Sequence, residues 1–81
     1  MSKLYLIPTP IGNLKDITLR ALEILKNVDS ILAEDTRKTK KLLNHYNITA
    51  QSASYHQHNE YRKLPKIITE LKSGMTYALV S

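Results

Sequence analysis

The stretch LYLIPTPIGN, residues 4–13, joins a short apolar run to a turn that contains two of the three prolines and one of the two glycines. Residues 3–8, KLYLIP, have the aliphatic and aromatic content of a short strand that ends at Pro8. A helical pattern starts soon after the turn. In a parallel sheet, a turn between a strand and a helix lies at the edge where ligands bind. The stretch therefore predicts the first strand of such a sheet and a loop placed at a functional site.

Strand and helix patterns alternate along the rest of the chain. Further strands are predicted at residues 29–35, 52–56 and 75–80. Helices are predicted at residues 16–28, with Asp16 as the N-cap, at 36–46 and at about 59–73. This alternation of strands with single helices favours an α/β fold, an open parallel sheet with helices on both faces.

The apolar positions of the helices indicate which sides pack on the sheet. The predicted buried positions are Ile17, Leu19, Ala21, Leu22, Ile24, Leu25, Val28, Leu42, Leu43, Tyr46, Leu64, Ile67, Ile68 and Leu71. Pro65 predicts that the third helix starts late or kinks there, and Gly74 suits the position just after its end. Tyr5 and Tyr61 are predicted to pack in the core or at its edge.

Composition limits the classes of function. A chain of 81 residues is at most one small domain, and its apolar content of 42% is ordinary for a folded protein. The absence of cysteine excludes disulfides and thiolate metal sites and fits a reducing compartment. The short apolar run at residues 4–7 is too small for a signal peptide or a membrane span, so we expect a cytoplasmic protein without a membrane partner. The net charge of +5 favours a polyanionic partner.

Residue 81 directly follows the last predicted strand. Because open parallel sheets bind ligands at the carboxyl ends of their strands, a chain that stops there lacks the loop expected next. We therefore expect residues 1–81 to be part of a longer protein. The alternative is a complete small domain whose last strand closes the sheet.

Five motifs carry a resemblance to a known family. They are PTPIGN at residues 8–13, DITLRA at 16–21, AEDTR at 33–37, SYHQHNE at 54–60 and ALVS at 78–81. Together they resemble the N-terminal part of the bacterial ribosomal RNA small subunit methyltransferase I family, within the tetrapyrrole (corrin/porphyrin) methylase superfamily. The resemblance implies that residues 1–81 form the N-terminal domain of the tetrapyrrole methylase fold, truncated after its fourth strand, with the C-terminal domain absent.

The resemblance also implies an activity. Members of that family transfer a methyl group from S-adenosyl-L-methionine to the ribose 2′-hydroxyl of a cytidine in the 16S ribosomal RNA of the small ribosomal subunit. They hold the cofactor between two α/β domains and work as homodimers, so residues 1–81 alone are expected to be inactive. Two alternatives stay open at this point: methylation of a small tetrapyrrole, and a non-catalytic module that binds RNA or protein.

The predicted strand tips supply the candidate site. By the resemblance, the loop beside the cofactor consists of Pro8, Thr9, Pro10, Ile11, Gly12 and Asn13. Its lone glycine matches no phosphate-binding fingerprint, so a rigid turn is the alternative. The candidate catalytic residues are Glu34, Asp35 and His56, because a ribose hydroxyl is a weak nucleophile that a carboxylate or an imidazole can activate. Asp35 is alternatively the N-cap of the next helix, and His56 a structural hydrogen-bonding residue.

A cluster of cations opens the helix predicted at residues 36–46. It consists of Arg37, Lys38, Lys40 and Lys41. Their charge opposes the helix dipole, so another interaction should favour them. We predict that Arg37 lies at the cleft and that the lysines contact RNA phosphates, with Asn59 as a further RNA contact. The alternatives are a solvated helix face and, for Arg37, pairing with Asp35 or Glu34. No metal site is predicted, because His56 and His58 lack a clear third ligand.

Overall fold

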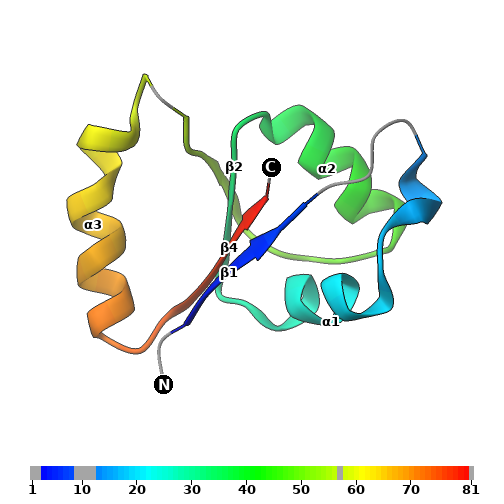
Figure 1. The fold of residues 1–81 in the computed structure, drawn as a ribbon, viewed down its shortest axis with the longest axis horizontal. Helices are drawn as coiled ribbons and strands as arrows, with labels where there is room; N and C mark the ends of the chain where they lie inside the picture. The colour runs from blue at the N-terminus through cyan, green and yellow to red at the C-terminus, as the bar shows by residue number, and fades with distance from the viewer. Residues whose placement is uncertain (1–2, 9–12, 57, 81) are drawn as a thin grey trace.

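Four parallel strands form a sheet in the order β1-β4-β2-β3, with helices on both faces (Figure 1). The computed structural model describes residues 3–8, 13–56 and 58–80. The strands are β1 (Lys3–Ile7), β2 (Ser30–Ala33), β3 (Ser52–Ser54) and β4 (Thr76–Val80). The helices are the 3-10 helix η1 (Leu14–Asp16), α1 (Leu19–Asn27), α2 (Thr36–His45) and α3 (Glu60–Lys72). The α/β fold predicted from the sequence is confirmed.

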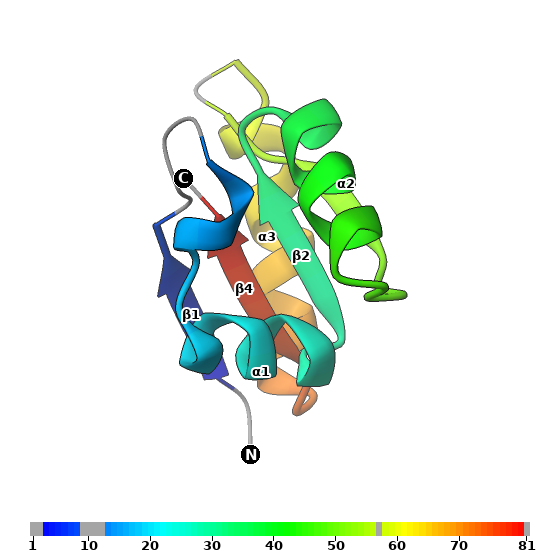
Figure 2. The ribbon, with the colours of Figure 1, turned by 90° about the vertical axis from the view of Figure 1, so that its right-hand side faces the viewer.

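The sheet lies between two helical layers. Figures 1 and 2 show α1 and α2 on one face and α3 on the other. Neighbouring residues of a strand point to opposite faces, and β2 shows this directly. Ile31 packs in the cluster beneath α1 and α2, whereas Leu32 packs beneath α3. The uninterrupted apolar run of β2 therefore reflects burial on both sides.

The first face, under α1 and α2, has the larger core. Its buried residues are Ile7, Leu25, Ile31, Leu42, Leu43, Ile48, Ala78 and Val80. The other apolar positions predicted for α1 and α2, together with Tyr5, pack against this cluster. Leu19 is the exception, because it lies on the outer side of α1 and is exposed. The predicted burial of Leu19 is therefore wrong.

The second face, under α3, is only partly covered. Ile67 packs with Leu32 and Tyr77 of the sheet. Leu64 and Ile68 were predicted to be buried as well, but each is 41% exposed. The predicted packing of Tyr61 is also wrong, since its side chain is exposed. Only one side of α3 meets the sheet, and these three residues lie beyond that contact.

The edge strand β1 is the least covered part of the second face. Leu4 and Leu6 point to that face, since their register partners in β4 are Tyr77 and Leu79, and both leucines are exposed. In Figure 2, α3 lies behind β4 and β2 and leaves β1 at the edge. Among the described residues, no helix covers this side of β1.

The start of α1 differs from the prediction. Thr18 is the N-cap, and its hydroxyl oxygen accepts a hydrogen bond of 3.0 Å from the backbone N–H of Ala21. Asp16 instead closes η1, and the chain is extended at Ile17 before α1 begins. The predicted N-cap at Asp16 is wrong because an extended residue separates the two helices.

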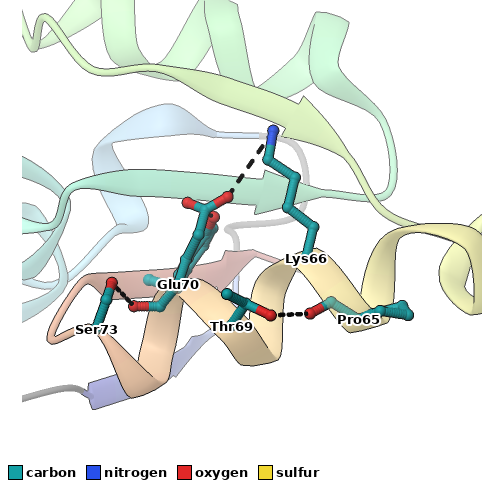
Figure 3. Close-up of polar contacts among 6 residues, drawn as sticks. Pro65, Lys66, Thr69, Glu70 and Ser73 are labelled. Carbon is teal, nitrogen blue, oxygen red and sulfur yellow. Dashed lines mark hydrogen bonds and ion pairs between the residues drawn. The ribbon is translucent and has the colours of Figure 1, made fainter.

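Helix α3 begins at Glu60 and continues through Pro65, so the predicted late start is wrong. The first turn is already bonded before the proline, since the N–H groups of Glu60 and Lys63 donate to His56 and Asn59. Figure 3 shows the polar contacts further along, where the Thr69 hydroxyl donates to the Pro65 carbonyl over 3.0 Å.

The end of α3 follows the prediction. Gly74 has a φ of 102° and lies just after the helix. The N–H of Met75 donates to Glu70, and the N–H of Gly74 donates to Leu71. The Ser73 hydroxyl also donates to the Glu70 carbonyl over 2.7 Å (Figure 3).

No helix in the described part of the chain has both the length and the apolar character needed to cross a membrane.

Candidate active site

The last residues of the four strands pair with one another, so the strands end at the same height of the sheet. Ile7 of β1 pairs with Val80 of β4. Val80 pairs in turn with Ala33 of β2, and Ala33 pairs with Ser54 of β3. Each of these is the last residue of its strand, so the chain leaves β1, β2 and β3 from a common edge, at the top of Figure 1. With about 4.8 Å between neighbouring strands, this carboxyl edge spans about 14 Å from β1 to β3. The parallel sheet predicted from the sequence thus brings these tips to one edge.

The tip of β2 presents its two acids differently. Asp35 is the N-cap of α2, and its Oδ1 accepts a hydrogen bond of 3.0 Å from the Arg37 backbone N–H. That bond, aided by the Arg37 guanidinium, holds the pKa of Asp35 below its ordinary value. Glu34 is exposed. The structure thus shows the cap role that the sequence left open for Asp35, and it leaves Glu34 as the more accessible carboxylate at this tip.

The cations of α2 lie on its outer side. Arg37 pairs with Asp35 over 3.4 Å between Nε and Oδ1, although its side chain is 89% exposed. Lys38, Lys40 and Lys41 are exposed as well, whereas Thr39 between them is buried. The pairing alternative for Arg37 is therefore observed. The contacts of these cations with RNA remain a prediction.

The loop after β3 is held from within. Asn59 Nδ2 donates to the Ser54 carbonyl over 3.3 Å and to the Ser54 hydroxyl over 3.1 Å. Asn59 Oδ1 accepts a bond of 2.8 Å from the His56 N–H. Because Asn59 is only 7% exposed and its amide is engaged in the loop, its predicted contact with RNA does not match its position. Asn59 orders the tip instead.

Sequence reasoning missed Lys63 at this tip. Its Nζ donates to the carbonyl and, over 3.2 Å, to the hydroxyl of Ser54. The two residues are nine positions apart, which corresponds to no helix or strand spacing. Only knowledge of where β3 ends and α3 begins brings them together, so the sequence carried no usable signal for this contact.

The histidines of the β3 loop form no metal centre with the described residues. The rings of His56 and His58 lie edge to face, with centroids 5.7 Å apart. Across residues 3–8, 13–56 and 58–80, no three His, Cys, Asp or Glu side chains are grouped so that they could hold a metal ion. The loop therefore offers hydrogen-bonding imidazole groups at the carboxyl edge.

The loop after β1 is described only at its ends. Four of its predicted cofactor residues, Thr9, Pro10, Ile11 and Gly12, lie outside the described residues. Pro8 is exposed at the tip. The Asn13 side chain caps η1 by accepting a bond of 2.9 Å from the Lys15 N–H. The Tyr46 hydroxyl donates to the Leu14 carbonyl over 2.6 Å, which fixes the far end of the loop against α2.

A pocket of about 230 Å³ lies away from the carboxyl edge. Its lining residues are Tyr5, Arg20, Glu23, Ile24, Asn27, Val28 and Thr76. Thr76 is the first residue of β4, so this pocket opens toward the opposite end of the sheet. Its volume is also below the roughly 300–1,000 Å³ of typical ligand pockets. The pocket is therefore not the predicted cofactor site.

Residues 3–81 match the sequence family described as Tetrapyrrole (Corrin/Porphyrin) Methylases. The chain belongs to this family. The match spans the whole sheet and every helix described above, so the level carboxyl edge is a feature of a tetrapyrrole methylase domain.

Curated relatives carry a more specific name. A protein of Bacillus subtilis (strain 168) named Ribosomal RNA small subunit methyltransferase I is 58% identical over 81 residues, which cover 100% of this chain and 28% of that protein. Proteins of the same name from Halalkalibacterium halodurans and Vibrio cholerae serotype O1 are 55% and 54% identical over 78 residues, covering 96% of this chain and 27% of each relative. The predicted resemblance is confirmed, and the chain spans 27–28% of the length of these relatives.

The carboxyl edge fits one wall of a site for S-adenosyl-L-methionine. That cofactor presents hydroxyl, amino and carboxylate groups, which bind to carboxylates, imidazoles and backbone groups. Glu34 and His56 offer such side chains at adjacent tips, because the register places Ala33 beside Ser54. The side chains at these two tips are therefore of the chemical kinds that such a cofactor binds.

Proposed function

We propose that this chain is part of an S-adenosyl-L-methionine-dependent methyltransferase that methylates the ribose 2′-hydroxyl of a cytidine in 16S ribosomal RNA. The observation that carries the proposal is the 58% identity, over the entire chain, to a relative named for methylation of small-subunit ribosomal RNA. The level strand tips support it, since they bring a carboxylate and an imidazole to one edge. The net charge of +5 suits a polyanionic substrate.

The proposed chemistry asks the protein chiefly for alignment. When bound, the cofactor supplies an activated methyl group, and its transfer is an in-line displacement. Glu34 is the proposed base, because its exposed carboxylate lies at the β2 tip while Asp35 is engaged as a helix cap. Pro8 to Asn13 form the proposed cofactor loop.

The same proposal covers the partners. Arg37, Lys38, Lys40 and Lys41 contact the RNA backbone from the outer side of α2, where all are exposed. The substrate is the RNA within the small ribosomal subunit, and the location is the cytoplasm. In a protein of the relatives' length, a second domain completes the cofactor site, and two copies form a homodimer.

A tetrapyrrole substrate is the second candidate, because the matched family is described by corrin and porphyrin methylation. The charge and the names of the relatives favour RNA. A non-catalytic RNA-binding module is the third candidate. It would bind RNA with the same affinity whether or not the cofactor is present.

The test uses the 81-residue chain and a protein of the relatives' length that carries this sequence. Each is titrated with S-adenosyl-L-methionine in a calorimeter and assayed for methyl transfer to small ribosomal subunits. We expect methylation by the longer protein, located at a cytidine ribose by mass spectrometry. Methylation of a porphyrin precursor and not of RNA would favour the second candidate.

Glu34→Gln in the longer protein should lower kcat by roughly 10²–10⁴-fold, the usual contribution of a general base. Glu23→Gln is the matched control, since Glu23 is an exposed carboxylate on α1. It should leave kcat unchanged. Equal rates for both variants would exclude Glu34 as the base.

A further inference from the structure

The end of β3 is tied to α3 by two side chains that share one target. The carbonyl oxygen of Ser54 accepts hydrogen bonds from both Asn59 Nδ2 and Lys63 Nζ. The Ser54 hydroxyl meets the same two groups at 3.1 and 3.2 Å. A carbonyl oxygen has two lone pairs, so both are used here. Asn59 and Lys63 therefore clamp the last residue of the strand.

The backbone of His56 is fixed by the same frame. Its N–H donates to Asn59 Oδ1 over 2.8 Å. Its carbonyl accepts from the N–H groups of Asn59, over 3.0 Å, and Glu60, over 2.9 Å. Since its backbone N–H and carbonyl are both bonded to residues at the start of α3, the backbone at His56 cannot rotate without breaking these hydrogen bonds.

The ring of His56 is oriented by its neighbour. The backbone N–H of His58 donates to His56 Nδ1 over 3.1 Å. A ring nitrogen that accepts a hydrogen bond carries no proton, so the neutral imidazole has its proton on Nε2. His56 is half-buried at the carboxyl edge, one residue beyond Tyr55, whose N–H donates to Ala33 of β2.

We propose that His56 acts as a hydrogen-bond donor through Nε2–H to an anionic oxygen of a ligand at the carboxyl edge, and that Asn59 and Lys63 are the positioning residues that hold it there. The inference deepens the proposed function and rests on it for the identity of the site. It separates the two side chains proposed for catalysis: a protonated Nε2 gives a hydrogen bond and cannot take a proton, which leaves that step to Glu34.

The anionic oxygen has two possible sources, a carboxylate of the cofactor and a phosphate of the RNA. Both accept a charge-assisted hydrogen bond of the same kind. Two separate titrations distinguish them, one with S-adenosyl-L-homocysteine and one with an oligonucleotide that carries the target cytidine.

The first measurement is the tautomer of His56, by long-range ¹H–¹⁵N correlation NMR on the protein of the relatives' length. We expect a proton on Nε2 and a bare Nδ1. His45, exposed at the end of α2, is the internal reference for an imidazole outside the frame. A proton on Nδ1 of neutral His56 would overturn the proposal, and this result does not depend on any catalytic activity.

The titrations use the same signal. A shift of the His56 Nε2 resonance with one of the two probes supports the proposal and identifies the source of the oxygen. No shift with either probe, while calorimetry shows that both bind, would overturn it. If neither probe binds and no methyl transfer occurs, the proposed function fails, whereas the tautomer measurement still stands by itself.

Substitutions of His56 distinguish a hydrogen-bond donor from a general base. The side-chain N–H₂ of glutamine keeps a donor close to the place of Nε2, so His56→Gln should retain most of the activity. His56→Ala should raise the KM for the ligand that it binds by roughly 10–100-fold with kcat little changed, because a charge-assisted hydrogen bond to a group of constant charge contributes to binding. If Gln and Ala lose kcat equally in folded protein while KM is unchanged, the ring is a base and the proposal is wrong.

The positioning role is tested at Lys63. Lys63→Met keeps the aliphatic stem and removes Nζ, so we expect a mixture of His56 tautomers and a rise in KM of about tenfold, with kcat little changed. Lys63→Arg, which keeps a hydrogen-bond donor, should partly restore the single tautomer and the wild-type kinetics. Lys66→Met is the matched control on the same helix, because Lys66 is 84% exposed and pairs with Glu70 over 3.8 Å. An unchanged tautomer and an unchanged KM in Lys63→Met would remove Lys63 from the proposal.

Discussion

The two faces of the sheet differ in how much of each is covered by the described residues. On the first face, α1 and α2 close over a continuous core that includes Leu25, which is 0% exposed. On the second face, α3 covers the inner strands, while Leu6 of the edge strand is 74% exposed. A parallel sheet buries both faces in a finished α/β domain. The difference shows that the first face is stabilised by its own helices and that the second offers uncovered apolar surface.

The two faces also differ in how the N-termini of their helices are capped. On the first face, α1 and α2 start at Thr18 and Asp35, whose side chains cap the helix. On the second face, Asn59 makes no side-chain cap bond to α3 and turns back to His56 and Ser54. The capping groups of the first face thus stabilise its helices, whereas Asn59 at the start of α3 stabilises the loop and the strand end that precede it.

The largest effect is expected from the core of the first face. Leu25→Ala should lower the free energy of unfolding by about 2–5 kcal/mol, because it leaves a cavity in a closed core. Leu19→Ala, on the exposed side of the same helix, should change it by less than about 0.5 kcal/mol. Urea denaturation of both variants measures the difference. Similar losses would mean that α1 does not pack as described.

A part-buried hydrogen bond joins α3 to the second face of the sheet. The Tyr77 hydroxyl donates to Glu70 Oε2 over 2.6 Å. Tyr77→Phe should cost about 1.5–3 kcal/mol, the range for a hydrogen bond to a charged group. Tyr61→Phe is the control, since Tyr61 is exposed. An equally stable Tyr77→Phe variant would show that apolar packing alone holds α3.

This contact also predicts a response to alkali. Burial, together with Glu70, raises the pKa of Tyr77 from 10.0 to about 12. Because the pKa is raised in the folded state, its contribution to stability is complete below pH 10 and is lost as the pH rises to about 12. The difference in melting temperature between the wild type and Tyr77→Phe should therefore shrink over that interval.

Acid should act on the first face through Asp35. Its pKa is lowered in the folded protein, so its contribution to stability is present above the ordinary value of 3.8 and is lost as the pH falls through the lowered pKa. Asp35→Asn keeps a capping oxygen and removes the titration. We expect a shallower fall of the urea midpoint for this variant between pH 5 and pH 2. Parallel curves for the two proteins would contradict the assignment of the cap.

The smallest effect on stability is expected at the uncovered edge. Leu6→Ser should change the free energy of unfolding of the 81-residue chain by less than about 0.5 kcal/mol, since the side chain is largely in water. It should however weaken self-association in sedimentation experiments, because exposed apolar surface on an edge strand promotes pairing. Leu19→Ser removes an exposed leucine from the outer side of α1 and should leave association unchanged.

Much of the fold could be predicted from local patterns. The order of strands and helices, the buried sides of α1 and α2 and the stop at Gly74 all follow from apolar spacing and from the special geometry of glycine. The errors lie where tertiary contacts decide. Leu64 and Ile68 carry a helical apolar stripe, yet their burial depends on which part of the sheet α3 covers.

The candidate site divides in the same way. The sequence motifs lie at the strand tips, and the register of the parallel strands brings those tips to one edge. The roles of single side chains did not follow from the motifs. Asp35 turned out to cap a helix, Asn59 to order a loop, and Lys63 to clamp a strand end that lies nine residues earlier.

The sequence by itself determined the class of fold, the family and the loops of the candidate site, because periodic apolar patterns and short motifs are local properties of a chain. Only the tertiary structure decided which polar atoms are already engaged and which remain for a ligand. Hydrogen bonds between Ser54, Asn59 and Lys63 form between a strand end and a helix start, and their geometry exists only once the two elements have packed.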